Sequence, residues 1–160
     1  MPPIISVVGK SKSGKTTLIE KLVPELKKRG YRIGTVKHAH HGFNMDEEGK
    51  DSWRHKAAGA ETVIVVSPGR IAIVKDENFQ KFEAFGKYFE GMDLVITEGF
   101  KKKNRPKIEI CRAERNAEPV CRDDKNLIAL VTDTETGLNV PNFGLEDIEA
   151  LADFIENKYL

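Results

Sequence analysis

The chain has 160 residues, 39% of them hydrophobic, and its 26 basic and 25 acidic residues leave a formal net charge of +1. This length and composition predict one folded domain over residues 1 to 160 and exclude a disordered chain. The balanced charge gives no field for holding nucleic acid or an anionic membrane, and no apolar run approaches the roughly 20 residues that cross a bilayer. We therefore expect neither nucleic acid nor a membrane as a partner.

The N-terminal residues and the two cysteines predict a cytoplasmic protein. The sequence begins without the pattern of a secretory signal. Cys111 and Cys121 lack the Cys-x-x-Cys spacing of a common metal site. We expect them to be free thiols in a reducing compartment.

The apolar patterns predict an α/β fold with a mostly parallel sheet. A buried strand over residues 2 to 8, a helix over 15 to 29 and a strand over 31 to 36 form the unit from which parallel sheets are built. The later predictions are a loop over 38 to 50, a short helix over 52 to 60, an antiparallel hairpin at about 62 to 75 with strands over 62 to 67 and 70 to 75, strands over 94 to 97, 107 to 111 and 127 to 132, and a closing helix over 145 to 158.

Two of these elements carry a more specific expectation. The strand over residues 107 to 111 alternates between polar and apolar residues, which is typical of an edge. The segment between the hairpin and residue 94 has aromatic residues at spacings of three and four, which predicts an amphipathic helix whose aromatic stripe is core. The stripe consists of Phe79, Phe82, Phe85, Tyr88 and Phe89.

A phosphate-binding motif lies between the first strand and the first helix. Residues 9 to 16, Gly-Lys-Ser-Lys-Ser-Gly-Lys-Thr, match G-x-x-x-x-G-K-[ST] throughout, so we expect a three-layer P-loop NTPase fold. The glycines allow backbone N–H groups and the helix N-terminus to face phosphate oxygens. Lys15 is expected to reach the β and γ phosphates and Thr16 to bind Mg²⁺. The predicted nucleotide contacts in this loop are Gly9, Lys10, Ser11, Lys12, Ser13, Gly14, Lys15, Thr16 and Thr17.

Lys10 has two interpretations. One class of dimeric P-loop ATPases carries a lysine just after the first glycine, where it reaches the nucleotide of the partner. The alternative is a solvated lysine near the phosphates.

Carboxylates are needed beside such a loop to fix the metal. Glu98 follows the strand over residues 94 to 97 and Asp93 precedes it, so only Glu98 lies at the C-terminal edge of a parallel sheet, where ligands bind. Asp46, in the loop after the second strand, is predicted to contact Mg²⁺ through water or to orient an attacking water. The expected catalytic residues are Lys15, Asp46 and Glu98, and the expected metal ligands are Thr16, Glu98 and Asp46.

Two further clusters leave alternatives open. His38, His40 and His41 suit zinc, but they are equally solvated loop residues or contacts to phosphate and to a partner. A basic run follows Glu98 and is either a solvated face or a site for an anionic second ligand or an acidic partner. The run contains Lys101, Lys102, Lys103, Arg105 and Lys107.

Several short motifs outside the phosphate loop resemble one family. They are Lys37-His-Ala-His-His41, Phe43, Asp46, Gly49-Lys-Asp-Ser52, Arg54, Ala58-Gly-Ala60, Ser67-Pro68 and Thr97-Glu-Gly-Phe-Lys101. With the phosphate loop they resemble the molybdopterin-guanine dinucleotide biosynthesis protein B family (MobB), up to about Ile110. The resemblance implies a GTP-binding protein with Mg²⁺ and weak GTPase activity that assists the attachment of GMP to molybdopterin. It also implies three partners: a molybdopterin guanylyltransferase, molybdopterin or its dinucleotide, and a second copy in a homodimer whose sheet the hairpin extends.

The sequence also suggests which residues recognise the base and which class of reaction to expect. Asp133 is the first candidate and Glu135 the second for a carboxylate that accepts hydrogen bonds from guanine N1 and N2, and the alternative is an ordinary polar turn. A small-molecule kinase or ligase and a nucleotide-ordered scaffold are the competing functions. No residue is an obvious nucleophile or general base for a defined acceptor, which favours an adapter with at most slow GTPase activity.

Overall fold

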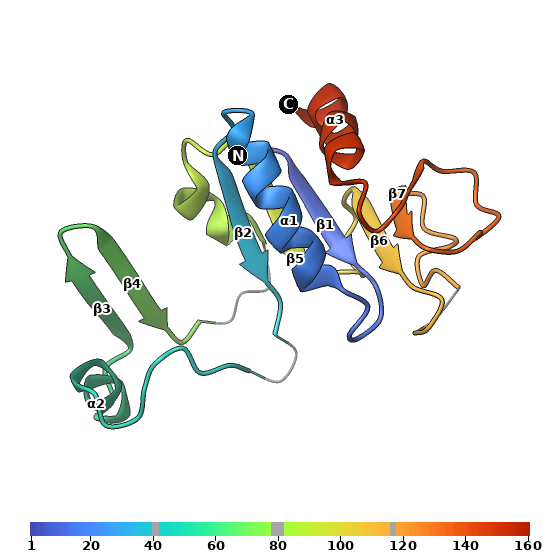
Figure 1. Cartoon of the computed structure of the whole chain (residues 1–160). Coiled ribbons are helices and arrows are strands. Elements are labelled where there is room, and N and C mark those ends of the chain that lie inside the picture. Colours follow the sequence, from blue (N-terminus) through green and yellow to red (C-terminus); the bar gives the residue numbers. More distant parts are fainter. Residues whose placement is uncertain (40–41, 78–81, 116–117) are drawn as a thin grey trace. The chain divides into compact units, whose positions relative to one another are not determined.

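A computed structural model of the chain describes residues 1 to 39, 42 to 77, 82 to 115 and 118 to 160 (Figure 1). It divides into two compact units, one formed by Met1–His38 and Phe85–Leu160 and the other by Ala39–Ala84. The expectation of one domain over residues 1 to 160 stays a prediction.

A six-stranded sheet forms the centre of the first unit, with the strand order β2-β5-β1-β6-β7-β8. Its strands are β1 (Ile4–Val8), β2 (Ile33–Lys37), β5 (Leu94–Glu98), β6 (Lys107–Cys111), β7 (Leu127–Thr132) and β8 (Asn142–Phe143). All neighbouring strands pair in parallel. The C-terminal ends of the strands therefore share one edge of the sheet, which is where ligands bind in open α/β folds.

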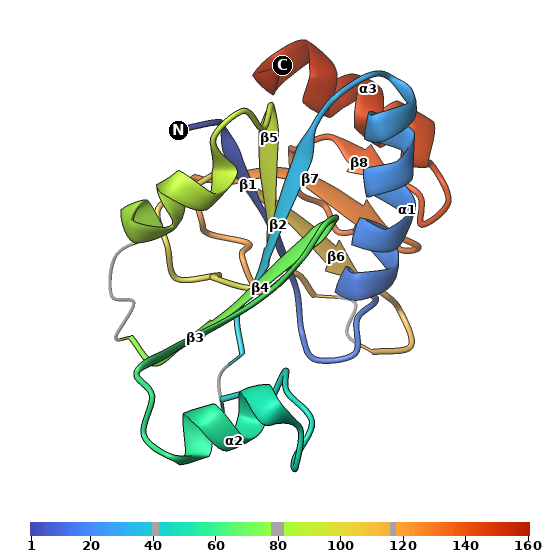
Figure 2. The same ribbon diagram turned by 90° about the vertical axis from the view of Figure 1, so that its left-hand side faces the viewer.

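Helices α1 (Lys15–Lys28) and α3 (Ile148–Tyr159) cover one face of this sheet (Figures 1 and 2). Leu18, Leu22 and Leu26 recur every four residues along α1, so they form one buried stripe. They share a hydrophobic core with α3 and with the strand residues that face the helices. No helix in the described ranges is long and apolar enough to cross a membrane.

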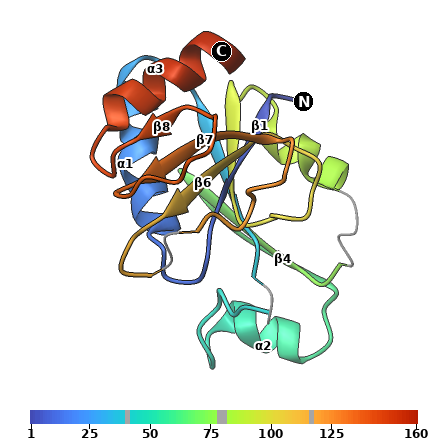
Figure 3. The same ribbon diagram turned by 90° about the vertical axis from the view of Figure 1, so that its right-hand side faces the viewer.

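Connecting segments cover the opposite face, where α1 and α3 are absent (Figure 3). Lys107, 1% exposed, donates hydrogen bonds to the main-chain oxygens of Lys103 and Arg105. Glu109, also 1% exposed, accepts from the main-chain N–H groups of Val120 and Cys121. These buried charges hold the β5–β6 and β6–β7 connections against the sheet.

The prediction that residues 107 to 111 form an edge strand is wrong. β6 lies between β1 and β7, and all five of its residues are buried. The alternation has another cause: Lys107 and Glu109 face loops, whose buried main-chain groups need polar partners.

The predicted aromatic helix is only partly present. Its described part is η1 (Phe82–Phe89), a 3-10 helix, and Phe79 lies outside the described residues. Gly86, a poor α-helix former, stands inside it. Tyr88 is 45% exposed, so its prediction as core is wrong. Phe89 is half-buried and lies against Gly34, where a Cβ atom would come within 2.5 Å of its ring.

The second unit contains α2 (Asp51–Ala57) and a hairpin of β3 (Thr62–Ser67) and β4 (Arg70–Lys75). The hairpin is antiparallel and forms its own two-stranded sheet. The predicted hairpin is confirmed with the same strand bounds, and α2 packs against β3.

Candidate phosphate-binding site

The phosphate loop leaves the end of β1 and enters the first turn of α1. Gly9 and Gly14 have φ angles of 143° and 102°, in the left-handed region that glycine adopts without strain. A Cβ atom at Gly9 would lie 2.4 Å from the carbonyl oxygen of Ile110 and 2.7 Å from the Ser13 hydroxyl. The path of the loop therefore requires glycine at position 9.

The start of α1 offers unused hydrogen-bond donors. No side chain caps the helix at Gly14, and its first turn contains no acidic residue. The first-turn N–H groups thus keep their partial positive charge. The Ser13 hydroxyl is buried and has no hydrogen-bond partner among the described residues. Such a set of donors fits the oxygens of a phosphate group.

Lys15 lies folded back over this loop. Its ammonium group donates to the main-chain oxygens of Gly9, at 3.3 Å, and Lys10, at 2.6 Å. Burial lowers the pKa of Lys15, while Glu98 raises it and the positive charge of Lys37 lowers it further. Phosphate oxygens could replace the two carbonyl oxygens as acceptors without moving the lysine away from the loop.

Glu98 ends β5 beside the loop and binds two side chains. The Thr16 hydroxyl donates to its Oε2 at 3.0 Å, and the Lys37 ammonium lies 3.5 Å from its Oε1. In the register of the sheet, Glu98 stands between Val7 of β1 and Lys37 of β2. The hydroxyl and the carboxylate are hard oxygen ligands of the kind Mg²⁺ takes along with waters and phosphate oxygens. Thr16 and Glu98 therefore fit the predicted magnesium site.

The turn after Glu98 holds the main chain at the end of β5 in place. Gly99 and Phe100 both have positive φ angles, 98° and 59°, and such a conformation costs free energy at a bulky residue. The Phe100 ring packs against His38 with a centroid distance of 4.6 Å. The His38 N–H donates to the main-chain oxygen of Glu98 at 3.0 Å. The end of β5 is thus tied to the end of β2.

Asp46 lies in the second unit, at the turn before α2. Its carboxylate accepts hydrogen bonds from the Ser52 hydroxyl at 3.0 Å and the Glu47 N–H at 2.9 Å. These contacts order the turn, and the role of Asp46 toward Mg²⁺ or water stays a prediction.

The zinc hypothesis falls largely outside the described residues, because His40 and His41 lie there. Within the described part, no three His, Cys, Asp or Glu side chains form a group that could hold a metal ion. Cys111 and Cys121 are free thiols, both buried.

Asp133 follows β7 at the same edge of the sheet as the phosphate loop. Its Oδ1 accepts a hydrogen bond from the Ala113 N–H at 2.8 Å, which links the chain after β7 to the chain after β6. Asp133 and Glu135 are both exposed. Their roles in base selection stay predictions, as do the nucleotide contacts of Lys10, Ser11, Lys12 and Thr17.

Lys37 is a member of this site to which the sequence reasoning gave no role. The sequence feature that points to Lys37 as a site residue is its place at the end of the second strand. A residue there lies at the ligand edge of a parallel sheet, but its contact with Glu98 requires β2 to neighbour β5.

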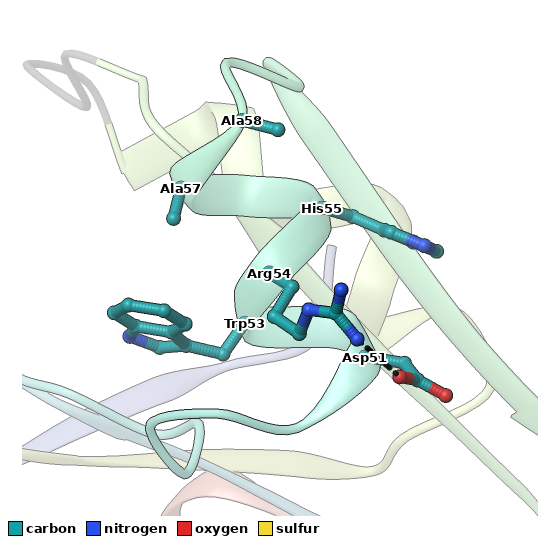
Figure 4. A pocket seen from close by; sticks show the side chains of 6 residues that line it. All are labelled: Asp51, Trp53, Arg54, His55, Ala57 and Ala58. Carbon is teal, nitrogen blue, oxygen red and sulfur yellow. Dashed lines mark ion pairs between the residues drawn. The ribbon is translucent and has the colours of Figure 1, made fainter.

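A hollow in the second unit includes none of the phosphate-loop residues. Side chains of α2 and the residue after it line this hollow, with Trp53 and His55 pointing in different directions (Figure 4). Arg54 pairs with Asp51 at 3.7 Å, but both side chains are well exposed. An exposed ion pair on a single short helix supports no assignment.

The chain is similar in sequence and in structure to known proteins. The family model described as "Molybdopterin guanine dinucleotide synthesis protein B" matches residues 4 to 133. A molybdopterin-guanine dinucleotide biosynthesis adapter protein from Haemophilus influenzae is 39% identical, over 97% of this chain and 88% of its own. The Escherichia coli protein of the same name is 37% identical, over 97% and 92%. The crystal structure of Bacillus subtilis MobB superposes with a TM-score of 0.78 at 30% identity, covering 99% of this chain and 98% of its own.

Proposed function

Because this chain belongs to the MobB family, we propose that it is a GTP-binding adapter in molybdopterin-guanine dinucleotide biosynthesis. Its relatives from H. influenzae and E. coli carry the name of adapter in that process. The observation that carries the nucleotide part is the 3.0 Å hydrogen bond between Thr16 and Glu98, which joins the phosphate loop to the end of β5.

The proposed site binds the phosphates of GTP through the loop and the start of α1. Main-chain N–H groups from Gly9 to Thr17 and the Ser13 hydroxyl donate to phosphate oxygens. Lys15 exchanges its contacts with the Gly9 and Lys10 carbonyls for contacts with the β and γ phosphates.

Thr16 and Glu98 would hold Mg²⁺. When bound, the ion would neutralise charge on the phosphate oxygens. The residues' own work is to orient the triphosphate: Thr16 aligns the first turn of α1, and Glu98 fixes the end of β5 against it.

Positioning, with slow hydrolysis, is the proposed role of the bound nucleotide. The Glu98 carboxylate accepts a hydrogen bond from Thr16, and as a ligand of Mg²⁺ it would not act as a free base for an attacking water. The adapter would present GTP to a molybdopterin guanylyltransferase, and molybdopterin or its dinucleotide would be a direct or indirect ligand.

Guanine recognition is proposed for Asp133. A carboxylate there would accept the two N–H groups on the Watson–Crick edge of guanine, which adenine lacks in that arrangement. Its Oδ1 also accepts a hydrogen bond from the Ala113 N–H, and a carboxylate oxygen has lone pairs for more than one donor.

A homodimer is proposed through the β3–β4 hairpin. Ile64 pairs with Ile73 and Val66 with Ile71, and paired residues share a face of the sheet. Their exposed fractions are 54%, 41%, 70% and 62% in that order. An isolated two-stranded hairpin is marginally stable in water, and an exposed apolar face of this kind is typical of an interface. A second copy would cover it.

The adapter role is tested by reconstitution with the guanylyltransferase. Formation of the dinucleotide from molybdopterin and GTP is measured against GTP concentration, with wild type, with Lys15→Ala and with Lys28→Ala. Compared with the guanylyltransferase alone, adding the wild-type protein should lower the GTP concentration at which dinucleotide forms at half its maximal rate. Adding Lys15→Ala should not. Lys28 has a 74% exposed side chain near the end of α1, so Lys28→Ala should match wild type. Equal curves with wild type and Lys15→Ala would contradict the proposal.

A further inference from the structure

Lys37 forms an ion pair with Glu98 beside the phosphate loop. It is the last residue of β2, directly opposite Glu98 in the register of the sheet. Its ammonium lies 3.5 Å from Glu98, and its side chain is 68% exposed. The Glu98 side chain is 16% exposed, but a contact this long from an exposed ammonium contributes modestly to stability. Its position at the phosphate loop therefore calls for another explanation.

The Glu98 carboxylate is shared between two kinds of partner. Oε2 accepts from Thr16, while Oε1 faces Lys37. Lys37 also lowers the pKa of Lys15, so the two ammonium groups lie within electrostatic range of each other. Two cations thus lie near Glu98 beside the phosphate loop. Of these two, Lys15 is anchored to main-chain oxygens of the loop, whereas Lys37 contacts the carboxylate.

We propose that Lys37 is a second cation for the terminal phosphate of a bound nucleoside triphosphate. In the nucleotide-free protein it rests on Glu98, and when Glu98 binds Mg²⁺ it turns to the γ-phosphate oxygens. This inference rests on the proposed binding of GTP at the phosphate loop.

Electrostatics drives the exchange. A carboxylate that ligates a divalent cation no longer attracts an ammonium group, and the cation repels it. Lysine has a flexible four-carbon stem and a rotatable ammonium, so it can change partners without backbone movement. A γ-phosphate provides the new acceptor, and a diphosphate lacks it. Lys37 would therefore distinguish the triphosphate from the diphosphate.

The test compares a non-hydrolysable GTP analogue with GDP, each titrated with Mg²⁺ into wild type, Lys37→Ala and Lys28→Ala by calorimetry. Loss of one charge-assisted hydrogen bond predicts that Lys37→Ala binds the triphosphate at least about tenfold more weakly. GDP affinity should stay within about twofold of wild type, because the diphosphate offers Lys37 no acceptor. Lys28→Ala should match wild type for both. Equal weakening for both nucleotides, or none for the triphosphate, would overturn the assignment.

A magnesium-free titration tests the exchange itself. With EDTA present, Lys37 stays on Glu98, so Lys37→Ala should weaken triphosphate binding much less than it does with Mg²⁺. An equal loss under both conditions would contradict the exchange. Failure of the proposed function is a separate outcome: wild type would then bind neither nucleotide, whereas failure of the Lys37 assignment leaves wild-type binding intact.

Discussion

At the residue scale, the buried charge of Lys107 shows how a polar side chain can stabilise the interior of a sheet. Its ammonium lies 2.8 Å from Asp124, whose side chain is 25% exposed. The hydrogen bond from Lys107 is the main cause that lowers the pKa of Asp124 to about 2. The folded state therefore favours the charged form of Asp124 more than the unfolded chain does.

The Lys107–Asp124 pair predicts how the free energy of unfolding changes with pH in the acid range. A carboxylate whose pKa is lower in the folded state stabilises fully above its unfolded pKa, near 4, and loses that contribution as pH falls through its folded pKa of about 2. Asp124→Asn removes this ionisation. At neutral pH it should lower the free energy of unfolding by about 1.5–3 kcal/mol, because the buried ammonium loses a charged acceptor.

Urea unfolding of both proteins between pH 7 and pH 2 measures the effect. The stability difference between wild type and Asp124→Asn should shrink as the pH falls from about 4 to about 2. A constant difference over that range would show that the Lys107 to Asp124 pair does not titrate as described.

Sequence alone predicts part of the site at this scale. Gly9 to Thr17 form a local sequence pattern, and Glu98 follows a strongly apolar strand, so both can be recognised from the sequence. Lys37 could not be given a role, because its contact depends on which strands are neighbours. The roles of Asp46 and Asp133 stay predictions: their observed contacts are with Ser52, Glu47 and Ala113.

At the element scale, local signals predict the hairpin well and β6 poorly. The Pro-Gly turn and the β-branched residues of β3 and β4 act within a few residues of each other, so they fix the element by themselves. The environment of β6 is set by segments outside it: β1, from the start of the chain, pairs with it, and Asp124 binds Lys107. The alternation produced by its two buried charges was interpreted as that of an edge strand for that reason. β8 has only two residues, too few for any periodic signal.

The hairpin gives a prediction about assembly. Val66 and Ile71 are paired on its apolar face, and we expect that face to be covered by a second copy. The double change Val66→Lys and Ile71→Lys should convert the dimer to a monomer, because buried lysines at an interface are costly.

Sedimentation velocity at several concentrations measures this change. Val65→Lys is the matched control: Val65 is next in sequence, points to the opposite face and is 50% exposed. It should leave the dimer intact. If wild type itself is a monomer, or if the double variant still dimerises, the hairpin interface is wrong.

At the scale of the whole molecule, the proposed function depends on one edge of one sheet. The ends of β1, β2, β5 and β7 bring together residues that are far apart in sequence: the phosphate loop, Lys37, Glu98 and Asp133. The alternation of strands and helices predicted a parallel sheet, and a parallel sheet predicts such an edge. The order of the strands is a tertiary property, so the sequence could not say which of these residues touch.

The net charge of +1 is also a property of the whole chain. It provides no general attraction for a nucleotide, so binding must come from the local donors of the phosphate loop. Binding of nucleotide through general surface charge would instead be weak and sensitive to salt.

The most direct test of the central claim is a parallel calorimetric titration of GTP, ATP and GDP with Mg²⁺ into wild type and Lys15→Ala. We predict that GTP binds wild type more tightly than ATP, that Asp133→Asn narrows this preference, and that Lys15→Ala keeps its fold by circular dichroism but no longer binds GTP. Tighter binding of ATP than GTP would contradict the guanine assignment, and an unchanged GTP affinity in Lys15→Ala would contradict the phosphate site itself.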